Sequence, residues 1–436
     1  MFQNSIFSGG YNLSVRITNL AEGVEGYYIE NKRFNTTLLT YNFYLPLKAE
    51  DMAINSFLPY LLTSCCSQYS DYIELNIGLL ELYGADLSCS ATKCGDCFHI
   101  KLGISVINDE FSFDDTKPVS AAAELLCGMI FAPALKDGSF SLSDIDREKN
   151  KTIERIEGEI NNKRAFTRTR LMAEMFGNDP YGKFSYGTVE EVNAIDSEKL
   201  LAAWENMLET AFVRINVVGS EYPEEVFLAA TKLFSSVNRH DITDTTRFVP
   251  LAEADEIKDV TQRLDVTQGK LAMGFTSKLH GSLESSAALT LCTDIFGGGP
   301  YSKLFSNVRE KQSLCYYCSA AARRSKGFVL VDSGIEEENA DKVVDSVLSE
   351  LEDVKNGKFD DSVIEASKKS IIDSLNGYYD NPIAIDTWYS REVNEVTSPE
   401  EAVKIIESIK REDIINAAKG IKLHTIYRLL PKGGNN

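Results

Sequence analysis

Histidine is scarce in this chain of 436 residues, which has only four: His99, His240, His280 and His424. Zinc motifs on a helix place two imidazoles at positions i and i+4, as in H-E-x-x-H or H-x-x-E-H. No two of the four histidines are near enough in sequence to form such a pair. The sequence therefore excludes a helical two-histidine zinc site within this chain.

Positive charge is also in short supply, with 45 Lys and Arg against 65 Asp and Glu and a formal net charge of −20. Such a charge repels phosphate backbones and anionic lipid headgroups. No apolar run approaches the ~20 residues that span a bilayer, and the start of the chain lacks a basic segment followed by an apolar core. We expect a cytoplasmic protein that binds neither nucleic acid nor membranes.

Nine cysteines are present, an odd number, and without a secretion signal we expect free thiols. Two C-x-x-C spacings, Cys94 to Cys97 and Cys315 to Cys318, permit a four-cysteine zinc site. Both pairs fall in strand-like segments, where residues i and i+3 point to opposite faces. We therefore favour buried cysteines over a metal site.

A cysteine nucleophile is a further alternative. Cys97 and His99 would share one face of a strand, which permits a Cys/His dyad. No Asn or Asp that could orient the imidazole is found nearby in sequence on that face. We interpret His99 as a buried or edge histidine.

The sequence contains an internal repeat. With a shift of 219, residues 135–165 align with residues 354–384 without a gap, and 10 of the 31 positions are identical. Apolar residues in each copy keep near-helical spacing after a KDG or KNG turn, so each half should carry a long helix at the same place. A chain of this length is expected to form two or more domains.

The two halves have the same predicted content, and the fold class is α+β. Each half should be a mainly antiparallel sheet with helices packed on one face. The predicted halves are 1–240 and 250–436, joined by a polar, acidic segment at 240–260. Predicted strands are 11–19, 36–47, 87–91, 98–106, 212–219, 270–278, 314–322, 328–335 and 424–430. Predicted helical regions are 50–84, 118–208, 283–295, 302–313, 339–355, 360–395 and 399–419.

One segment of the second half stands out, GGGPYSKLFSNVREKQSLCYY at 297–317. Taken alone, Arg309 would be a helix-terminal arginine that reaches solvent, and Tyr316 a core tyrosine in a strand. The glycines Gly297, Gly298 and Gly299 are not followed by the Lys-Ser/Thr pair of a phosphate-binding loop. They predict a tight turn that allows a close approach of two backbones.

The duplicated unit with this segment in its second copy resembles the insulinase/pitrilysin metallopeptidase family over essentially the whole chain. The resemblance implies a clam-like pair of halves. In that family, zinc is held by an inverted H-x-x-E-H motif in the first half, and a later Glu completes the metal shell. A Gly-rich turn, a helix ending in Arg and a Tyr seven residues later contact the peptide carbonyl. Arg309 and Tyr316 occupy those last two positions.

The zinc motif of the family is missing here. At its place the sequence has Ser56, Pro59 and Tyr60, and Arg155 stands seven residues after Glu148, where the distal Glu would be. The resemblance is to those members that lack the zinc motif and accompany a zinc-bearing homologous subunit. We therefore expect no metal or cofactor in this chain, and zinc in the partner.

The function implied is that of a non-catalytic, substrate-binding subunit of a heterodimeric zinc peptidase that acts on short or unfolded peptides. Arg309, Tyr316 and Gly297 to Gly299 would bind the peptide, and the isolated chain could form a homodimer. The alternatives are a scaffold or peptide-binding protein without hydrolysis, and a self-contained cysteine hydrolase. The basic run KRAFTRTR (163–170) would be a solvated helix face or would line a substrate chamber.

Overall fold

The computed structural model describes residues 6–8, 14–69, 71–114, 116–278, 282–391 and 397–432, so His280 lies outside the described residues. The chain forms two compact units made of interleaved segments. Unit 1 consists of Met1–Glu157, Ser185–Arg247 and Tyr378–Ser398, and unit 2 consists of Gly158–Phe184, Phe248–Gly377 and Pro399–Asn436. Each unit thus contains one segment from the other half of the repeat.

Unit 1 is built on a seven-stranded sheet of order β1-β2-β3-β9-β4-β6-β5. All neighbours are antiparallel except β3 and β9. The strands are β1 (Ile6–Ser8), β2 (Ser14–Ala21), β3 (Val24–Glu30), β4 (Thr36–Pro46), β5 (Asp86–Cys94), β6 (Cys97–Ile107) and β9 (Phe212–Gly219).

The apolar face of this sheet forms the core of unit 1. Alternate strand residues such as Tyr41, Phe43 and Ile100 pack there against helices. The helices are α1 (Met52–Leu62), α2 (Tyr72–Glu81), α3 (Pro118–Phe131), α4 (Leu142–Gly158), α6 (Val189–Asn193), α7 (Ser197–Thr210) and α8 (Glu224–Ser235), with a small hairpin β7 (Leu135–Lys136) and β8 (Ser139–Phe140).

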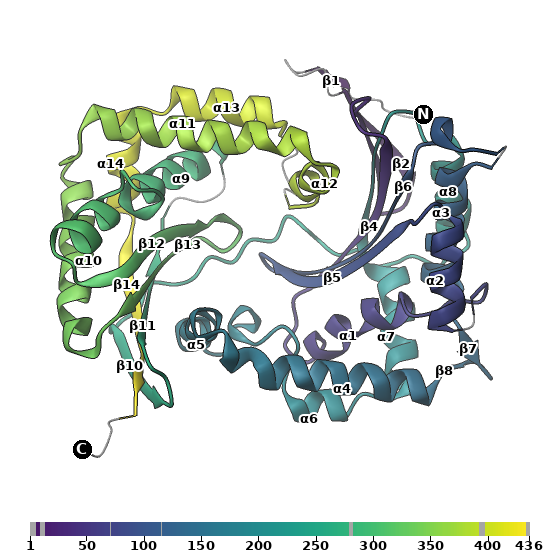
Figure 1. Ribbon diagram of the computed structural model, residues 1–436, viewed down its shortest axis with the longest axis horizontal. Helices are drawn as coiled ribbons and strands as arrows, with labels where there is room; N and C mark the ends of the chain where they lie inside the picture. The colour runs from purple at the N-terminus through teal and green to yellow at the C-terminus, as the bar shows by residue number, and fades with distance from the viewer. Residues whose placement is uncertain are drawn as a thin grey trace. The chain divides into compact units, whose positions relative to one another are not determined.

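Unit 2 is built on a five-stranded sheet of order β10-β14-β11-β13-β12. The strands are β10 (Lys258–Leu264), β11 (Gly269–Thr276), β12 (Cys315–Arg323), β13 (Phe328–Ile335) and β14 (Lys422–Pro431). The helices are α5 (Lys163–Phe176), α9 (Leu283–Gly297), α10 (Ala340–Lys355), α11 (Asp361–Gly377), α13 (Pro399–Ser408) and α14 (Arg411–Lys419). Figure 1 shows α9 and α5 on opposite sides of this sheet.

The two sheets have the same topology. The order β3-β9-β4-β6-β5 in unit 1 matches β10-β14-β11-β13-β12 in unit 2, and in each sheet the first pair is the parallel one. The α+β prediction, with two sheets that each bear packed helices, is confirmed. Among the described helices, none has the length and apolar character needed to cross a membrane.

Each sheet also has a second, more polar face, covered by one helix from the other half of the repeat. In unit 1 this helix is α12 (Pro382–Arg391), which packs on β9 and β4, and in unit 2 it is α5, which packs on β11 and β14. Lys163 and Pro382, the first residues of α5 and α12, are equivalent under the shift of 219. The repeat therefore includes a helix that each half contributes to the opposite unit.

A buried carboxylate attaches α12 to the sheet of unit 1. Asp386 is fully buried and accepts hydrogen bonds from Thr40 Oγ1 (2.5 Å) and Asn216 Nδ2 (2.9 Å), and it pairs with Lys101. Tyr44 donates to the carbonyl of Ser390 on the same helix.

A second buried carboxylate attaches α5 to the sheet of unit 2. Asp332 on β13 pairs with Arg164 (2.5 Å) and Arg168 (2.7 Å) and accepts from Ser319 Oγ (2.7 Å). Burial alone would raise the pKa of Asp332, but these hydrogen bonds and charges hold it below its ordinary value. Arg164 and Arg168 of the basic run thus anchor the helix to the sheet, although their side chains stay 44% and 35% exposed, so the run is only partly the solvated face that was predicted.

Several local predictions were wrong, and the short strands β1, β7 and β8 were not predicted. The region 360–395 is not a single helix, because α11 ends at Gly377 and α12 starts at Pro382, which cannot continue a helix. The strand β3 was not predicted. The strand β10 was not predicted either, and its first three residues fall in the segment 240–260, which otherwise has no regular structure.

We expect Asp386→Ala to lower the free energy of unfolding by about 3–5 kcal/mol, because it leaves Lys101 largely buried without its carboxylate. Urea unfolding followed by far-UV circular dichroism measures the loss. The matched control is Asp380→Ala, which removes an exposed carboxylate that pairs with Arg33 and should cost less than about 1 kcal/mol. Equal losses for the two variants would contradict the proposed role of Asp386.

Candidate functional site

The segment between α9 and β12 departs from regular backbone geometry three times within a short stretch. Residues Leu304–Lys311 form a π-helix, which is rare and is often found at functional sites. Ser313 has a positive φ of 53°, which is unusual for a residue with a side chain. Strand β12 then has a bulge between Cys315 and Tyr317. Such irregularities cost free energy and are over-represented at binding sites.

The glycine run positions this segment against the sheet. Gly297 ends α9, and a Cβ there would lie 2.6 Å from the backbone nitrogen of Ala320 on β12. The close approach of two backbones is therefore observed. None of Gly297, Gly298 and Gly299 has a positive φ, so the turn that Gly298 and Gly299 form after the helix is not left-handed. Their role in binding a substrate stays a prediction.

Arg309 and Tyr316 are brought together by the structure. Arg309 lies in the last turn of the π-helix, and its Nε donates a 3.0 Å hydrogen bond to the carbonyl of Tyr316. The guanidinium also pairs with Glu310 (2.9 Å) and stacks on the ring of Phe305 at 4.6 Å. Its side chain is 39% exposed and Tyr316 is 55% exposed. The two residues are not sealed in the core.

The hydroxyl of Tyr316 donates to Glu336, which follows β13. This hydrogen bond and the negative charge of Glu336 raise the pKa of Tyr316, so the phenol keeps its proton near neutral pH. A protonated phenol beside an exposed guanidinium can donate hydrogen bonds to a carbonyl oxygen. Glu336 would compete with that oxygen for the single phenolic proton.

The positions that would hold zinc in the first half lie on α1 and α4 and have other contacts. Ser56 is buried and donates to the carbonyl of Ala53 (2.9 Å). Pro59 lies inside α1, and its carbonyl accepts from Thr63 N and Oγ1 at 3.1 and 2.8 Å. Neither residue offers a side chain that could bind zinc well.

Arg155 and Tyr60 meet at the same place. The guanidinium of Arg155 lies 4.2 Å from the ring centroid of Tyr60 and 5.9 Å from that of Tyr186. Burial, and then a hydrogen bond with Tyr186, raise the pKa of Tyr60 well above its usual range. The neutral phenol of Tyr60 is a poor ligand for zinc, and the guanidinium of Arg155 stacked on it would repel a metal ion.

Glu148 of the same helix is buried and binds Lys151 (2.7 Å) and Arg147 (3.5 Å). Across the described residues, no group of three or more His, Cys, Asp or Glu side chains could hold a metal ion. The residues at the degenerate position therefore do not fit zinc.

The two C-x-x-C pairs differ from the geometry that we predicted. Cys94 and Cys97 face each other across a two-residue hairpin turn between β5 and β6. Cys315 and Cys318 lie opposite Ile335 and Ser333, because the bulge adds one residue between them. In both pairs the two residues therefore lie on the same side of the sheet. The prediction that they point to opposite faces was wrong. All nine cysteines lie in the described part of the chain and none is in a disulfide.

The Cys97/His99 dyad is not supported by its surroundings. His99 is buried, stacks on Tyr44 at 4.6 Å and makes a 2.9 Å hydrogen bond with Asn42 Oδ1. Burial and nearby positive charges lower the pKa of His99 to about 3, and burial raises the pKa of Cys97 to about 12. A protonated thiol beside a neutral imidazole that resists protonation is a poor nucleophile pair.

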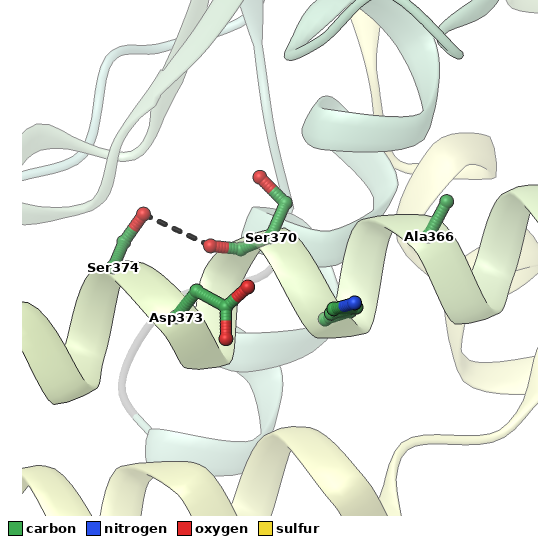
Figure 2. A pocket seen from close by; sticks show the side chains of 5 residues that line it. Ala366, Ser370, Asp373 and Ser374 are labelled. Carbon is green, nitrogen blue, oxygen red and sulfur yellow. Dashed lines mark hydrogen bonds between the residues drawn. The ribbon is translucent and has the colours of Figure 1, made fainter.

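The hollows on the described surface include the following two. One lies along α11 and is lined by one face of that helix, with Ser370, Asp373 and Ser374 among the side chains drawn in Figure 2. Ser374 donates to the carbonyl of Ser370, as the dashed line shows. The other is a cavity of about 320 Å³ between α2 and β5. Neither hollow includes Arg309 or Tyr316.

Comparisons with known proteins agree with this geometry. A family model described as the peptidase M16 inactive domain matches residues 194–371. A probable inactive metalloprotease YmfF from Bacillus subtilis is 29% identical over 412 residues, which is 93% of this chain and 96% of that protein.

Two solved structures have the same fold. A conserved protein from Enterococcus faecalis V583 has a TM-score of 0.88 and 26% identity, over 97% of this chain and 100% of that one. A peptidase M16 inactive domain from Pseudomonas fluorescens has a TM-score of 0.78 and 18% identity, over 97% and 99%.

The low pKa of His99 predicts a pH dependence of stability. An unfolded histidine titrates near ~6.5, whereas folded His99 stays neutral down to about 3. The unfolded state therefore binds more protons between these values, and this contribution to stability is lost as the pH falls. We expect the wild type to lose up to about 1.4 kcal/mol per pH unit more than His99→Gln below pH 6.5. Urea unfolding at pH 7, 6 and 5 measures this, and parallel curves would contradict it.

Cys315 should be unusually reactive. A hydrogen bond with Cys318 lowers the pKa of Cys315 to about 7, with further contributions from Ser333 and the charge of Arg309. We expect its alkylation by iodoacetamide, followed by peptide mass spectrometry, to have a midpoint near that pH. Cys318→Ala should move the midpoint upward by about one unit or more, whereas Cys318→Ser keeps a donor and should move it less. An unchanged midpoint in Cys318→Ala would rule out the hydrogen bond as the cause.

Proposed function

Because the chain belongs to the M16 peptidase inactive-domain family, we propose that it is the non-catalytic, substrate-binding subunit of a heterodimeric zinc peptidase. The zinc-bearing subunit would be a homologous chain. The observation that supports this proposal most is the hydrogen-bonded pair of a partly exposed Arg309 and an exposed Tyr316 on an irregular backbone segment.

The positions that fail to fit zinc support the non-catalytic part of the proposal. Ser56, Pro59 and Tyr60 offer no imidazole or carboxylate, and Arg155 brings a positive charge to the place of a dication. Without a metal site on the described residues, this chain would depend on its partner for the zinc-bound water that attacks the peptide bond.

In the complex, Arg309 and Tyr316 would bind the carbonyl group of the substrate. The Nε of Arg309 is held by the carbonyl of Tyr316, which fixes the plane of the guanidinium, and Nη1 pairs with Glu310. The remaining N–H groups, including both on Nη2, are left to donate. The hydroxyl of Tyr316 would turn from Glu336 to the substrate oxygen. Both donors gain strength as negative charge develops on that oxygen, which is how such a pair contributes to rate.

The substrates would be short or unfolded peptides, because an extended backbone is needed to present one carbonyl to both donors. We propose a cytoplasmic location for the pair. The competing function is a scaffold or peptide-holding protein whose complex does not hydrolyse peptides.

We expect Arg309→Ala to lower peptide turnover by the reconstituted pair by about 10²–10³-fold, the usual cost of one lost donor to a developing oxyanion. Zinc content, measured by plasma mass spectrometry, should be unchanged and should reside in the partner. Tyr316→Phe removes only the hydroxyl and should have an effect in the same direction.

The matched control for this experiment is Arg323→Ala, which removes an exposed arginine from the far end of the same strand. It should leave turnover unchanged. Full turnover by Arg309→Ala would show that the residue is misassigned. Absence of turnover in every reconstituted wild-type pair would favour the scaffold function, and stoichiometric zinc in this chain alone would contradict the proposal.

A further inference from the structure

Arg155, which stands where the resemblance places the distal zinc-binding Glu, is a cation without an acidic partner among the described residues. Arg155 is exposed, in the last turn of α4. Among the acids of the described chain, none lies within salt-bridge distance of its guanidinium, although the sequence has 65 Asp and Glu. Two acids at helical spacing from Arg155 are used elsewhere: Glu148, two turns earlier, pairs with Lys151 (2.7 Å), and Glu159, four residues later, pairs with Arg170 (4.0 Å).

The stacking of Arg155 leaves its hydrogen-bond donors available. A guanidinium that lies over an aromatic ring uses its face for the ring and keeps its N–H groups in the plane. Tyr60 provides that ring at 4.2 Å, and its hydroxyl is itself held by a hydrogen bond with Tyr186. The ring of Tyr60 therefore fixes the guanidinium of Arg155, while the N–H groups of the guanidinium stay available to donate. Bidentate binding of a carboxylate requires both conditions.

An apolar cavity lies next to this cation. The cavity of about 320 Å³ between α2 and β5 is lined largely by apolar side chains and has Thr63 and Cys89 at its wall: Thr63, Tyr72, Leu75, Asn76, Leu79, Leu80, Gly84, Ala85, Asp86, Leu87 and Cys89. Tyr60, whose ring lies 4.2 Å from the guanidinium of Arg155, is about one helical turn before Thr63 on α1, and Thr63 Oγ1 contacts Cys89 Sγ at 3.4 Å. The guanidinium therefore lies beside the wall formed by Thr63 and Cys89, and its positive charge partly offsets the rise that burial causes in the pKa of Cys89.

A carboxylate-binding group and an apolar cavity side by side match the last residue of a peptide. Among the residues of a peptide, only the C-terminal one, when its side chain is apolar, carries a carboxylate and an apolar group on the same Cα. An internal Asp or Glu supplies the carboxylate but no apolar group. We propose that Arg155, stacked on Tyr60, binds the C-terminal carboxylate of a peptide whose last side chain enters the cavity between α2 and β5.

This site is separate from the proposed function of Arg309 and Tyr316, which belong to unit 2, whereas all residues of the new site belong to unit 1. The new site would bind the negatively charged end of a peptide, whereas a metal site would bind a positively charged ion. No covalent step is involved. A failure of one proposal therefore leaves the other unaffected.

The test uses the purified full chain and four fluorescein-labelled hexapeptides, with binding measured by fluorescence anisotropy. The first ends in Leu as the free acid and the second is its C-terminal amide. The third is the free acid with Ser as the last residue, and the fourth is an amidated peptide with one internal Glu. We expect the first to bind at least about tenfold more tightly than each of the others. The two amides lose the charge-assisted hydrogen bonds of the terminal carboxylate, and the Ser peptide loses the apolar side chain that fills the cavity.

Variants of the chain connect this binding to the named residues. Arg155→Gln should weaken binding of the first peptide at least about tenfold, and Arg155→Lys should weaken it less because charge remains but the bidentate fork is lost. Leu80→Asn, at a position that is 72% exposed, should reduce the preference for Leu over Ser without unfolding the helix.

The matched control is Arg16→Gln. Arg16 also lies 4.2 Å over a tyrosine ring, that of Tyr222, but it is not associated with the cavity. Binding should not change in this variant. Equal binding of acid and amide, loss of binding in the Arg16 control as large as in Arg155→Gln, or no binding of any peptide at millimolar concentration would overturn the proposal. Equal binding of the internal-Glu peptide would assign the site to acidic side chains instead and would also overturn it.

Discussion

A buried carboxylate on the polar face of each sheet is the interaction on which both units depend. In unit 1 the carboxylate belongs to the covering helix, as Asp386, and the cation to the sheet, as Lys101. In unit 2 the order is reversed, with Asp332 on the sheet and Arg164 and Arg168 on the helix. Lys101 and Asp332 lie on equivalent strands of the repeat, β6 and β13. The charge reversal means that each covering helix suits only the sheet of the opposite half, since on its own sheet it would meet like charge.

The structure separates what the sequence could predict from what it could not. The repeat and the buried strand 212–219 were recognisable because both leave local patterns, and β9 has the predicted bounds. Strand β10 was missed because its residues are half exposed and it has little apolar alternation. The break between α11 and α12 had a visible signal in Pro382, because proline cannot continue a helix.

The wrong predictions at the candidate site have another physical cause: a local backbone irregularity, or a contact between residues that are distant in sequence. The faces of the C-x-x-C pairs depend on one hairpin turn and one bulge, and a single extra residue reverses which face a side chain occupies. The partner of His99 is Asn42, 57 residues away in sequence, and no local pattern identifies a neighbour on another strand. The stacking of Arg155 on Tyr60 is of the same kind, since the sequence located both residues but not their contact.

The π-helix at Leu304–Lys311 restricts which insertions and deletions this segment can accept. A π-helix has hydrogen bonds from residue i to i+5, so each of its turns contains more residues than a turn of α-helix. Removal of one residue would convert the turn to an α-helix and rotate everything after it by about 100°. The guanidinium at its end would then leave the carbonyl that it now holds. Insertions and deletions in this stretch should therefore be tolerated far less than substitutions, even at positions that contact nothing.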